Sequence, residues 1–433
     1  MVELRVVSDA VPMTTPSTSS PSRLTDSPAL AQDRRRYLVA SGVALWGAQL
    51  GVVAVPLTAV AALSADARGT ALLAATTALP FMILGLPVGA WLDRVRRRPV
   101  MVGADVVRAA SLATVPLADW LGALTFTQLW LVVLVNGVAT VFFDLGTQSH
   151  LKDLAPADRL VETNGRLATL TQTALICAPP LAGWAAGLLS APAVLAATSV
   201  GYAWSALWLS RLRTPELAHA ADAGRRRLLG DIREGVRFVR RQPVLLAVLG
   251  AGCLVNVGTA SFTAVLPVYA LHDLGWAESD LGLFLGAGGI GGLLGAMTAN
   301  TVARVLGAGR SVLVIGVAVA PTAVVLPLTG DPVPGYLAAG AWALIIYKIG
   351  FDAVLMTSFR QAVTPAHLLA RVNATMRVLF TAAVAFGAAS AGVVATVVGN
   401  QGVLIVATIA LGLVWLPIAL SPLPRLSTLT GGP

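Results

Sequence analysis

The chain has 433 residues, of which 56% are hydrophobic and only 12% are charged. A water-soluble protein of this length carries roughly twice that charged fraction, so the composition excludes an ordinary soluble domain. The net charge of +9 does not indicate nucleic-acid binding, because the basic residues form short clusters between apolar segments. We therefore expect a membrane protein whose main partner is the lipid bilayer, and no nucleic-acid partner.

The chain opens with a polar segment, residues 1–33, that is rich in Ser, Thr and Pro. This segment has no apolar stretch before a cleavage site, so we expect a disordered tail rather than a removable signal. The remainder contains apolar stretches long enough to cross a bilayer, which takes about 20 residues. These stretches lie at 37–63, 70–92, 99–118, 123–147, 166–189 and 191–210, and again at 244–271, 280–303, 311–329, 335–358, 373–398 and 400–420.

The spacing of these stretches predicts an all-α integral membrane protein with twelve transmembrane helices in two six-helix bundles. Its expected parts are an N-terminal tail (1–33), an N-terminal bundle (34–210), a central linker (211–243), a C-terminal bundle (244–421) and a C-terminal tail (422–433).

The distribution of charge between the stretches predicts their orientation. Arginine and lysine collect on the cytoplasmic side of membrane proteins. Alternate loops here hold Arg96–Arg98, Lys152 with Arg159, Arg304 with Arg310, and Arg360 with Arg371, whereas the intervening loops carry mainly acidic residues. Both termini and the linker are therefore expected in the cytoplasm, and the protein in the cell membrane. Within the linker, the apolar spacing from Leu228 to Val239 fits either a helix on the anionic inner leaflet or a solvated charged run.

The two predicted bundles share a sequence repeat. The matching positions are Phe143-Asp144 with Phe351-Asp352, Pro156 with Pro365, Asn164 with Asn373, and Gly183 with Gly392. Four matches that stay in register to within one residue indicate parallel repeats, which many transporters contain.

A short motif joins the second and third predicted helices and runs from Gly89 to Arg98. It resembles the loop signature of the major facilitator superfamily, Gly-x-Leu-Ala-Asp-Arg-x-Gly-Arg-Lys, although Arg96 replaces the second glycine. The matching residues are Gly89, Asp93, Arg94, Arg97 and Arg98.

The resemblance implies a pseudo-symmetric transporter fold with a cytoplasmic latch between the halves. Asp93 and Arg97 would form a charge relay with Asp144, and the start of the eleventh helix near Arg371 and Asn373 would face them. Gly89 would let two helices approach closely. A simpler interpretation is that the arginine cluster only sets the topology of the chain.

A second motif runs from Phe142 to Gly165 and is followed by Ala178-Pro179-Pro180-Leu181-Ala182-Gly183. It resembles the drug and siderophore exporter branch of the superfamily, which includes macrolide-efflux-like and enterobactin-exporter-like proteins. The resemblance implies proton-coupled efflux of amphiphilic organic compounds by alternating access.

Charged residues inside the predicted spans form two local pairs, Lys348 with Asp352 and Asp105 with Arg108. A charge in a span costs roughly 2.5–3.5 kcal/mol on the insertion scale, so it marks function or a partner. Lys348 and Asp352 could carry a proton or form a neutralised structural pair. Asp105 and Arg108 are also candidates for coupling, but for them we favour a structural pair.

The expected substrate cavity is lined by helices 1, 4, 7 and 10, as in the resembled fold. The polar residues near the middle of those helices are Gln49, Asn136, Asn256, Thr259 and Tyr347. Few polar groups among many apolar ones suit a small amphiphilic solute better than a sugar.

No catalytic, metal-ligating or cofactor-binding pattern stands out. The fingerprint-like Gly286–Gly291 lies inside a predicted span, and the histidines have no metal spacing. We therefore expect no enzyme activity, no cofactor and no metal, and a monomer. The alternatives are an importer of a small amphiphilic metabolite, or a membrane receptor or scaffold that does not transport.

Overall fold

The computed structural model describes residues 28–92, 95–154, 157–213, 228–330 and 334–425. The first half of the chain forms α1 (Pro28–Leu57), α2 (Ala67–Leu92), α3 (Arg97–Trp120), α4 (Phe126–Leu154), α5 (Ala157–Leu188) and α6 (Ala191–Ser210). The second half forms α7 (Leu228–Arg241), α8 (Pro243–Val268), α9 (Glu278–Leu306), α10 (Ala308–Val319), α11 (Gly335–Val363), α12 (Ala366–Gly412) and α13 (Trp415–Ala419).

The number of membrane crossings agrees with the sequence. Ten helical segments of the described chain are long and apolar enough to span a membrane. One of these, Arg371–Ala419, contains two crossings, because Gly399 has a φ of 73° and breaks α12 there. Only glycine adopts that left-handed conformation without steric cost. With α5, whose Thr, Gln and Pro residues lower its hydropathy, the total is twelve, as predicted.

The first helix of each half ends in the same irregular way. α1 continues as a π turn at Thr58–Ala62, and α8 continues as a π turn at Tyr269–Asp273. π turns are rare in helices. Their matching positions support the pseudo-symmetry of the two halves.

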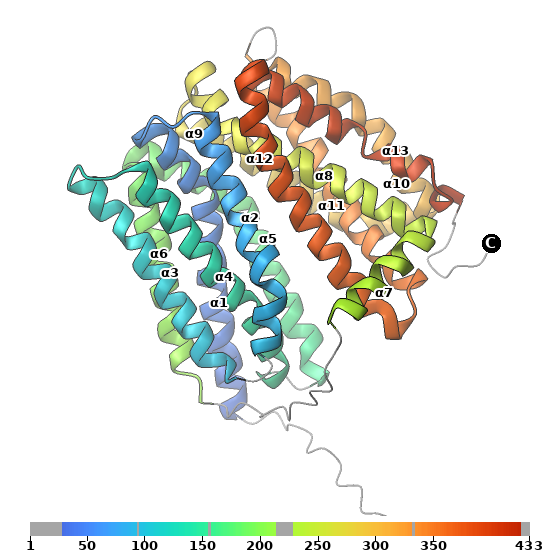
Figure 1. Cartoon of the computed structure of the whole chain (residues 1–433), viewed down its shortest axis with the longest axis horizontal. Helices are drawn as coiled ribbons and strands as arrows, with labels where there is room; N and C mark the ends of the chain where they lie inside the picture. The colour runs from blue at the N-terminus through green and yellow to red at the C-terminus, as the bar shows by residue number, and fades with distance from the viewer. Residues whose placement is uncertain (1–27, 93–94, 155–156, 214–227, 331–333, 426–433) are drawn as a thin grey trace, which may run out of the picture.

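The two halves form an inverted V (Figure 1). Helices α1 to α6 lie on one side and α8 and α10 to α13 on the other, with α9 at the top against α5; the halves meet at the top and spread apart toward the bottom, where α7 lies. We call the bottom the linker end. Helices α2 and α4 end there, at residues 92 and 154, and helices α8 and α12 begin there, at residues 243 and 366. The other end, which carries the turns at 63–66 and 274–277, is the opposite end.

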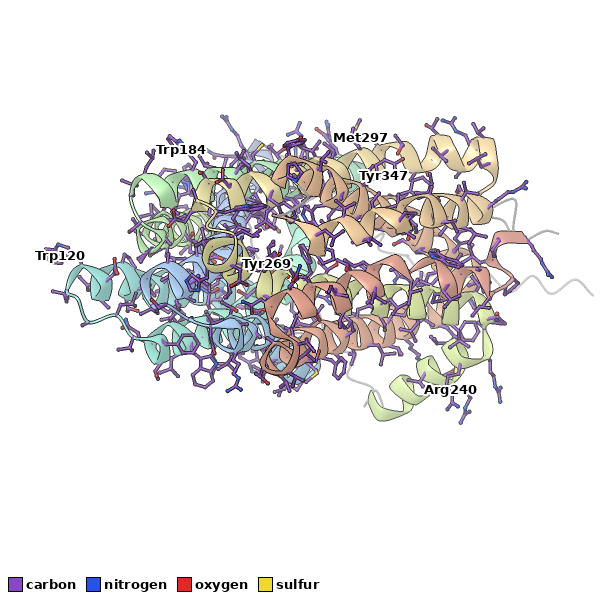
Figure 2. All side chains as sticks on the ribbon, turned by 90° about the horizontal axis from the view of Figure 1, so that it is seen from above. Trp120, Trp184, Arg240, Tyr269, Met297 and Tyr347 are labelled. Carbon is purple, nitrogen blue, oxygen red and sulfur yellow. The ribbon has the colours of Figure 1, made fainter. Side chains whose placement is uncertain are left out.

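The outer surface of the bundle is largely hydrocarbon, as a lipid environment requires. Side chains project outward all round the helices, with Trp120 at the left edge of the view and Arg240 at the lower right, whereas Tyr269 lies near the middle (Figure 2). Trp120 is 81% exposed and Tyr269 is buried, with its hydroxyl donating to the carbonyl of Thr329 at 3.1 Å.

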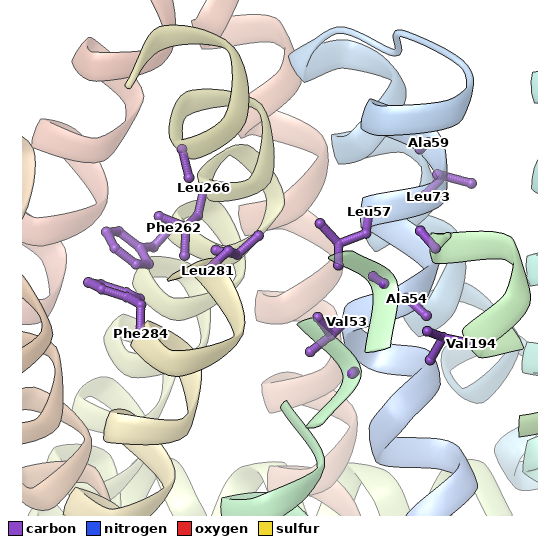
Figure 3. Packing of buried hydrophobic residues seen from close by; sticks show 14 of the residues in the cluster. Val53, Ala54, Leu57, Ala59, Leu73, Val194, Phe262, Leu266, Leu281 and Phe284 are labelled. Carbon is purple, nitrogen blue, oxygen red and sulfur yellow. The ribbon is translucent and has the colours of Figure 1, made fainter. Parts of the chain in front are cut away.

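An apolar core joins the halves near the opposite end. Val53 and Leu57 of α1 belong to the same buried cluster as Phe262 of α8 and Phe284 of α9. Figure 3 shows the members from the two halves facing one another. Within the C-terminal half, the rings of Phe262 and Trp342 stack, with centroids 4.7 Å apart, and so support this side of the core. Burial of apolar side chains against each other therefore holds the halves together at this end.

Two close helix crossings seal the opposite end. At the first, Gly183 of α5 lies against Gly282 of α9, where an added Cβ would come within 2.9 Å of the Gly282 Cα. At the second, Gly392 of α12 lies against Ala71 of α2, and an added Cβ would be 2.8 Å from the Ala71 Cβ. Small residues let helix backbones approach this closely. The two glycines are the pair that the sequence repeat placed in register.

Helix α7 packs on the C-terminal half at the linker end. Glu234 forms an ion pair with Arg371 of α12, and Gly235 lies against the Arg371 carbonyl. Val239 is buried in the core of the C-terminal half, whereas Val236 is partly exposed. The amphipathic pattern in the linker therefore produces a helix that docks in part against protein.

Candidate functional site

A cavity of about 590 Å³ lies between the two halves. Its lining comes from α2 of the N-terminal half and from α8, α11 and α12 of the C-terminal half. The lining residues are Thr77, Ala78, Asn256, Arg360, Asn373, Arg377, Phe380, Thr381 and Val384. The cavity lies on the linker-end side of the glycine crossings.

Arg360 is the charged residue that α11 contributes to this cavity. Its side chain is half-buried; one terminal nitrogen lies 4.0 Å from the sulfur of Met376, and its Nε is buried without a hydrogen-bond partner. The sequence led us to expect Arg360 in a cytoplasmic loop. It lies instead on a continuous helix, because α11 extends to Val363.

Arg377 is the second arginine of the cavity and comes from α12. Its guanidinium carbon lies 4.1 Å from the centroid of the Phe81 ring of α2. It also interacts electrostatically with Asp144 of α4. One side chain of the C-terminal half therefore contacts α2 of the N-terminal half and lies within electrostatic range of α4.

Asp144 connects Arg377 to a buried charge cluster in the N-terminal half. Asp144 interacts electrostatically with Arg108 as well as with Arg377. Arg108 forms a buried ion pair with Asp105, and its guanidinium carbon lies 4.1 Å from the ring centroids of both Phe143 and Tyr202. The pair expected for Asp105 and Arg108 is present, and its cation–π contacts pack α3 against α4 and α6.

The predicted latch is only partly within the described chain. Asp93 and Arg94 lie outside the described residues. Arg97 begins α3. Arg98 donates to the carbonyls of Leu209 (3.0 Å) and Ser210, which are free acceptors at the end of α6. Arg98 therefore joins α3 to α6 within one half.

The role expected for Gly89 is not supported. Among the described residues, an added Cβ at Gly89 would meet no atom within 4 Å, so no described helix approaches closely there. The close approaches occur instead at the opposite end, at Gly183 and Gly392.

The pair of Lys348 and Asp352 is present as an ion pair on α11. Both residues are almost fully buried. Lys348 packs against Gly316 of α10 and lines a small space together with Val319 of α10 and Trp415 of α13. The pair therefore faces the interior of the C-terminal half and does not line the inter-half cavity.

Of the five predicted cavity residues, Asn256 lines the cavity. Tyr347 is turned toward α9, where its hydroxyl lies 2.8 Å from that of Thr298. Gln49 is half-buried. Gly47 and Gly51 contact Thr198 of α6, and Gln49 lies on the opposite face of α1, away from α6. Asn136 and Thr259 are half-buried, and each has a buried polar side-chain atom without a partner.

Sequence reasoning missed both arginines as cavity residues. Arg377 lies four residues after Asn373, inside a stretch that the sequence analysis counted as a span. The cost of a charge in a span would have singled it out. The cavity was instead assigned to helices 1, 4, 7 and 10, which left out α2 and α12.

Comparison with known proteins gives related efflux proteins. Macrolide efflux protein A of Streptococcus pyogenes is 21% identical over 295 residues, which cover 67% of this chain and 72% of that protein. Multidrug efflux pump Tap of Mycolicibacterium fortuitum is 27% identical over 375 residues, which cover 84% of this chain and 89% of that protein.

Solved transporters share the fold. A bacterial homologue of the human lysosomal transporter Spinster superposes with a TM-score of 0.72 at 12% identity, covering 92% of this chain and 97% of that one. A bacterial homologue of the iron transporter ferroportin gives 0.70 at 16% identity, covering 90% and 99%. A family model described as Major Facilitator Superfamily matches residues 37–374, which reach into both halves. The chain is therefore a multi-pass membrane transporter, not an enzyme, and belongs to the major facilitator superfamily.

Proposed function

We propose that this protein exports amphiphilic organic compounds across the plasma membrane by alternating access, coupled to the proton gradient. The observation that carries the proposal is the cavity between the halves, which both halves line while the opposite end is sealed. In alternating access the two halves move relative to each other around such a site. The names of two efflux relatives favour export over import.

The linker end would face the cytoplasm. Arg98, Arg211 and the basic helix α7 lie at this end, whereas Asp66, Asp273 and Glu278 lie at the opposite end. This asymmetry follows the rule that arginine and lysine remain on the cytoplasmic side. The cavity would then receive its solute from the cytoplasm or the inner leaflet, as an exporter requires. The protein would act as a monomer, since both halves of one chain contribute to the described lining of the cavity.

The latch would use Asp93, Arg97 and Asp144, with Arg377 of α12 as its partner in the other half. Arg377 is well placed for this role because it interacts with Asp144 across the interface. Protonation of a carboxylate in this group would weaken the attraction between the halves. Asp93→Asn is then expected to reduce transport strongly while expression and membrane insertion stay normal; normal transport by this variant would exclude the latch.

Accumulation assays test the proposed function. Cells that express the native chain or Asp93→Asn are loaded with a panel of lipophilic dyes and antibiotics, with and without a proton uncoupler. We expect lower accumulation with the native chain, and loss of that difference with either the substitution or the uncoupler. Higher accumulation with the native chain would support import, and equal accumulation of every compound would count against broad-specificity efflux.

A further inference from the structure

The lining of the inter-half cavity is unbalanced in charge. Arg360 and Arg377 both line it, and the part of the lining that the structure describes contains no carboxylate. The remaining lining residues are neutral: Asn256, Asn373, Thr77 and Thr381 are polar, and Ala78, Phe380 and Val384 are apolar. The described cavity wall therefore combines positive charge with apolar surface.

The two arginines differ in how their charges are balanced. Arg377 forms no direct ion pair with Asp144, but it lies within electrostatic range of that carboxylate and over the face of the Phe81 ring. In the described part of the chain no carboxylate lies within ion-pair distance of Arg360, and its Nε is buried without a partner. A partly buried guanidinium without a counter-charge is unfavourable, because burial removes its solvation and no carboxylate compensates. Arg360 is therefore the group in this wall that most requires an anionic ligand.

We propose that this cavity binds an amphiphilic organic anion, with Arg360 as its anchor. A guanidinium holds a carboxylate, sulfonate or phosphate through two parallel hydrogen bonds. The side-chain amide of Asn373, whose Oδ1 is also buried without a partner, lines the same cavity and can turn its NH₂ toward the anion. The apolar body of the ligand would pack against Phe380 and Val384.

This inference rests on the proposed transport function, since it assigns the substrate class to the same cavity. The volume of about 590 Å³ fits an organic molecule and exceeds what a small inorganic ion needs. The same chemistry is present in a free organic acid and in an anionic phospholipid headgroup. The test therefore includes both sources.

Binding to the purified full-length chain in nanodiscs tests the proposal. The probes are 8-anilinonaphthalene-1-sulfonate, which is anionic, and N-phenyl-1-naphthylamine, which has the same aromatic body without the sulfonate. Empty discs of the same lipid provide the background. We expect the native protein to bind the sulfonate at least about tenfold more tightly than the neutral compound, since a charge-assisted bond contributes this much or more.

Variants test whether Arg360 causes the preference for the sulfonate probe. Arg360→Gln is expected to weaken binding of the sulfonate about tenfold or more and to leave the neutral probe unchanged. Arg360→Lys, which keeps the charge, should recover part of the loss. Arg304→Gln is the matched control, because Arg304 is exposed at the end of α9 and does not line the cavity. Equal binding of the two probes, or no effect of Arg360→Gln in a variant that elutes as a folded monodisperse protein, would overturn the proposal.

Two further measurements separate the possible failures. Discs of neutral phosphatidylcholine are compared with discs that contain phosphatidylglycerol; if only the anionic lipid competes with the sulfonate at Arg360, the ligand is a lipid headgroup. Uptake and release of both probes is then followed in proteoliposomes. Selective binding without transport would refute the proposed function and leave the anion site standing, whereas transport of the neutral probe alone, unaffected by Arg360→Gln, would refute the anion site.

Discussion

The guanidinium of Arg377 lies over the ring of Phe81, 4.1 Å from its centroid, and so joins α12 of one half to α2 of the other. The contact is within the span, beside the inter-half cavity that Arg377 lines. Any movement that separates the halves around this cavity must change or break it. The strength of the contact therefore influences the equilibrium between the conformations.

Removal of the ring should test this influence directly. A cation–π contact contributes about 0.5–2 kcal/mol, so Phe81→Leu should change the transport rate about two- to thirtyfold. The measurement is the initial rate of dye release from energised vesicles. Phe386→Leu is the control, since Phe386 is 67% exposed on the outside of α12. Equal rates for Phe81→Leu and the control would show that the contact does not limit transport.

Neutralisation of Asp144 should have a larger effect. Asp144→Asn leaves both Arg108 and Arg377 without its charge, so we expect transport to fall about tenfold or more with normal protein yield. Asp119→Asn, near the end of α3 at the opposite end, serves as the matched substitution. Transport by Asp144→Asn at the level of Asp119→Asn would exclude Asp144 from the mechanism.

The two interpretations of the Lys348–Asp352 pair on α11, proton transfer and structural neutralisation, predict different results for its variants. Loss of one partner leaves a buried charge, which costs about 3–5 kcal/mol, so Lys348→Met and Asp352→Leu alone should each give little folded protein. The double variant removes both charges. Because the pair faces α10 rather than the cavity, we expect the double variant to recover folded yield and transport. Folded double variant that no longer transports would instead make the pair part of proton coupling.

Adding one methyl group at Gly183 should loosen the packing that closes the opposite end. Gly183→Ala would place its Cβ against the backbone of Glu278 and Gly282 and force α5 away from α9. We expect a cysteine introduced at Leu266, in the sealed core, to react several-fold faster with a membrane-impermeant thiol reagent.

The background for this labelling lacks Cys177 and Cys253, the two native cysteines. Gly340→Ala is the control, because an added Cβ there meets nothing within 4 Å. An unchanged labelling rate in Gly183→Ala would mean that the helices adjust without opening the seal.

The fold could be predicted from the sequence because the membrane reduces the problem to a few rules. Apolar stretches of sufficient length give the spans, and Gly399 marks the break between the last two. The repeat placed Gly183 and Gly392 in register, and both occupy equivalent helix crossings. Local sequence sufficed here because every backbone polar group in a span must be satisfied within its own helix.

The cavity was harder to predict, because it depends on how whole halves tilt against each other. Asn256 was recognised, whereas Tyr347 turned out to face α9 and Thr298. Periodicity tells which residues share a face of a helix but not which neighbour that face meets. Arg360 was assigned to a loop for the same reason: its charge was visible in the sequence, and its position on α11 was not.

The two glycine crossings have a consequence for the origin of the chain. Gly183 of α5 meets α9, and its repeat partner Gly392 of α12 meets α2, which is the equivalent of α9 in the other half. In a two-fold symmetric dimer of identical subunits, residue i of one copy meets residue j of the other, and j meets i. The interface between the halves has this isologous form within a single polypeptide. A gene duplication that fused two copies of a six-helix unit accounts for it, since one glycine in the ancestral unit would have provided both crossings.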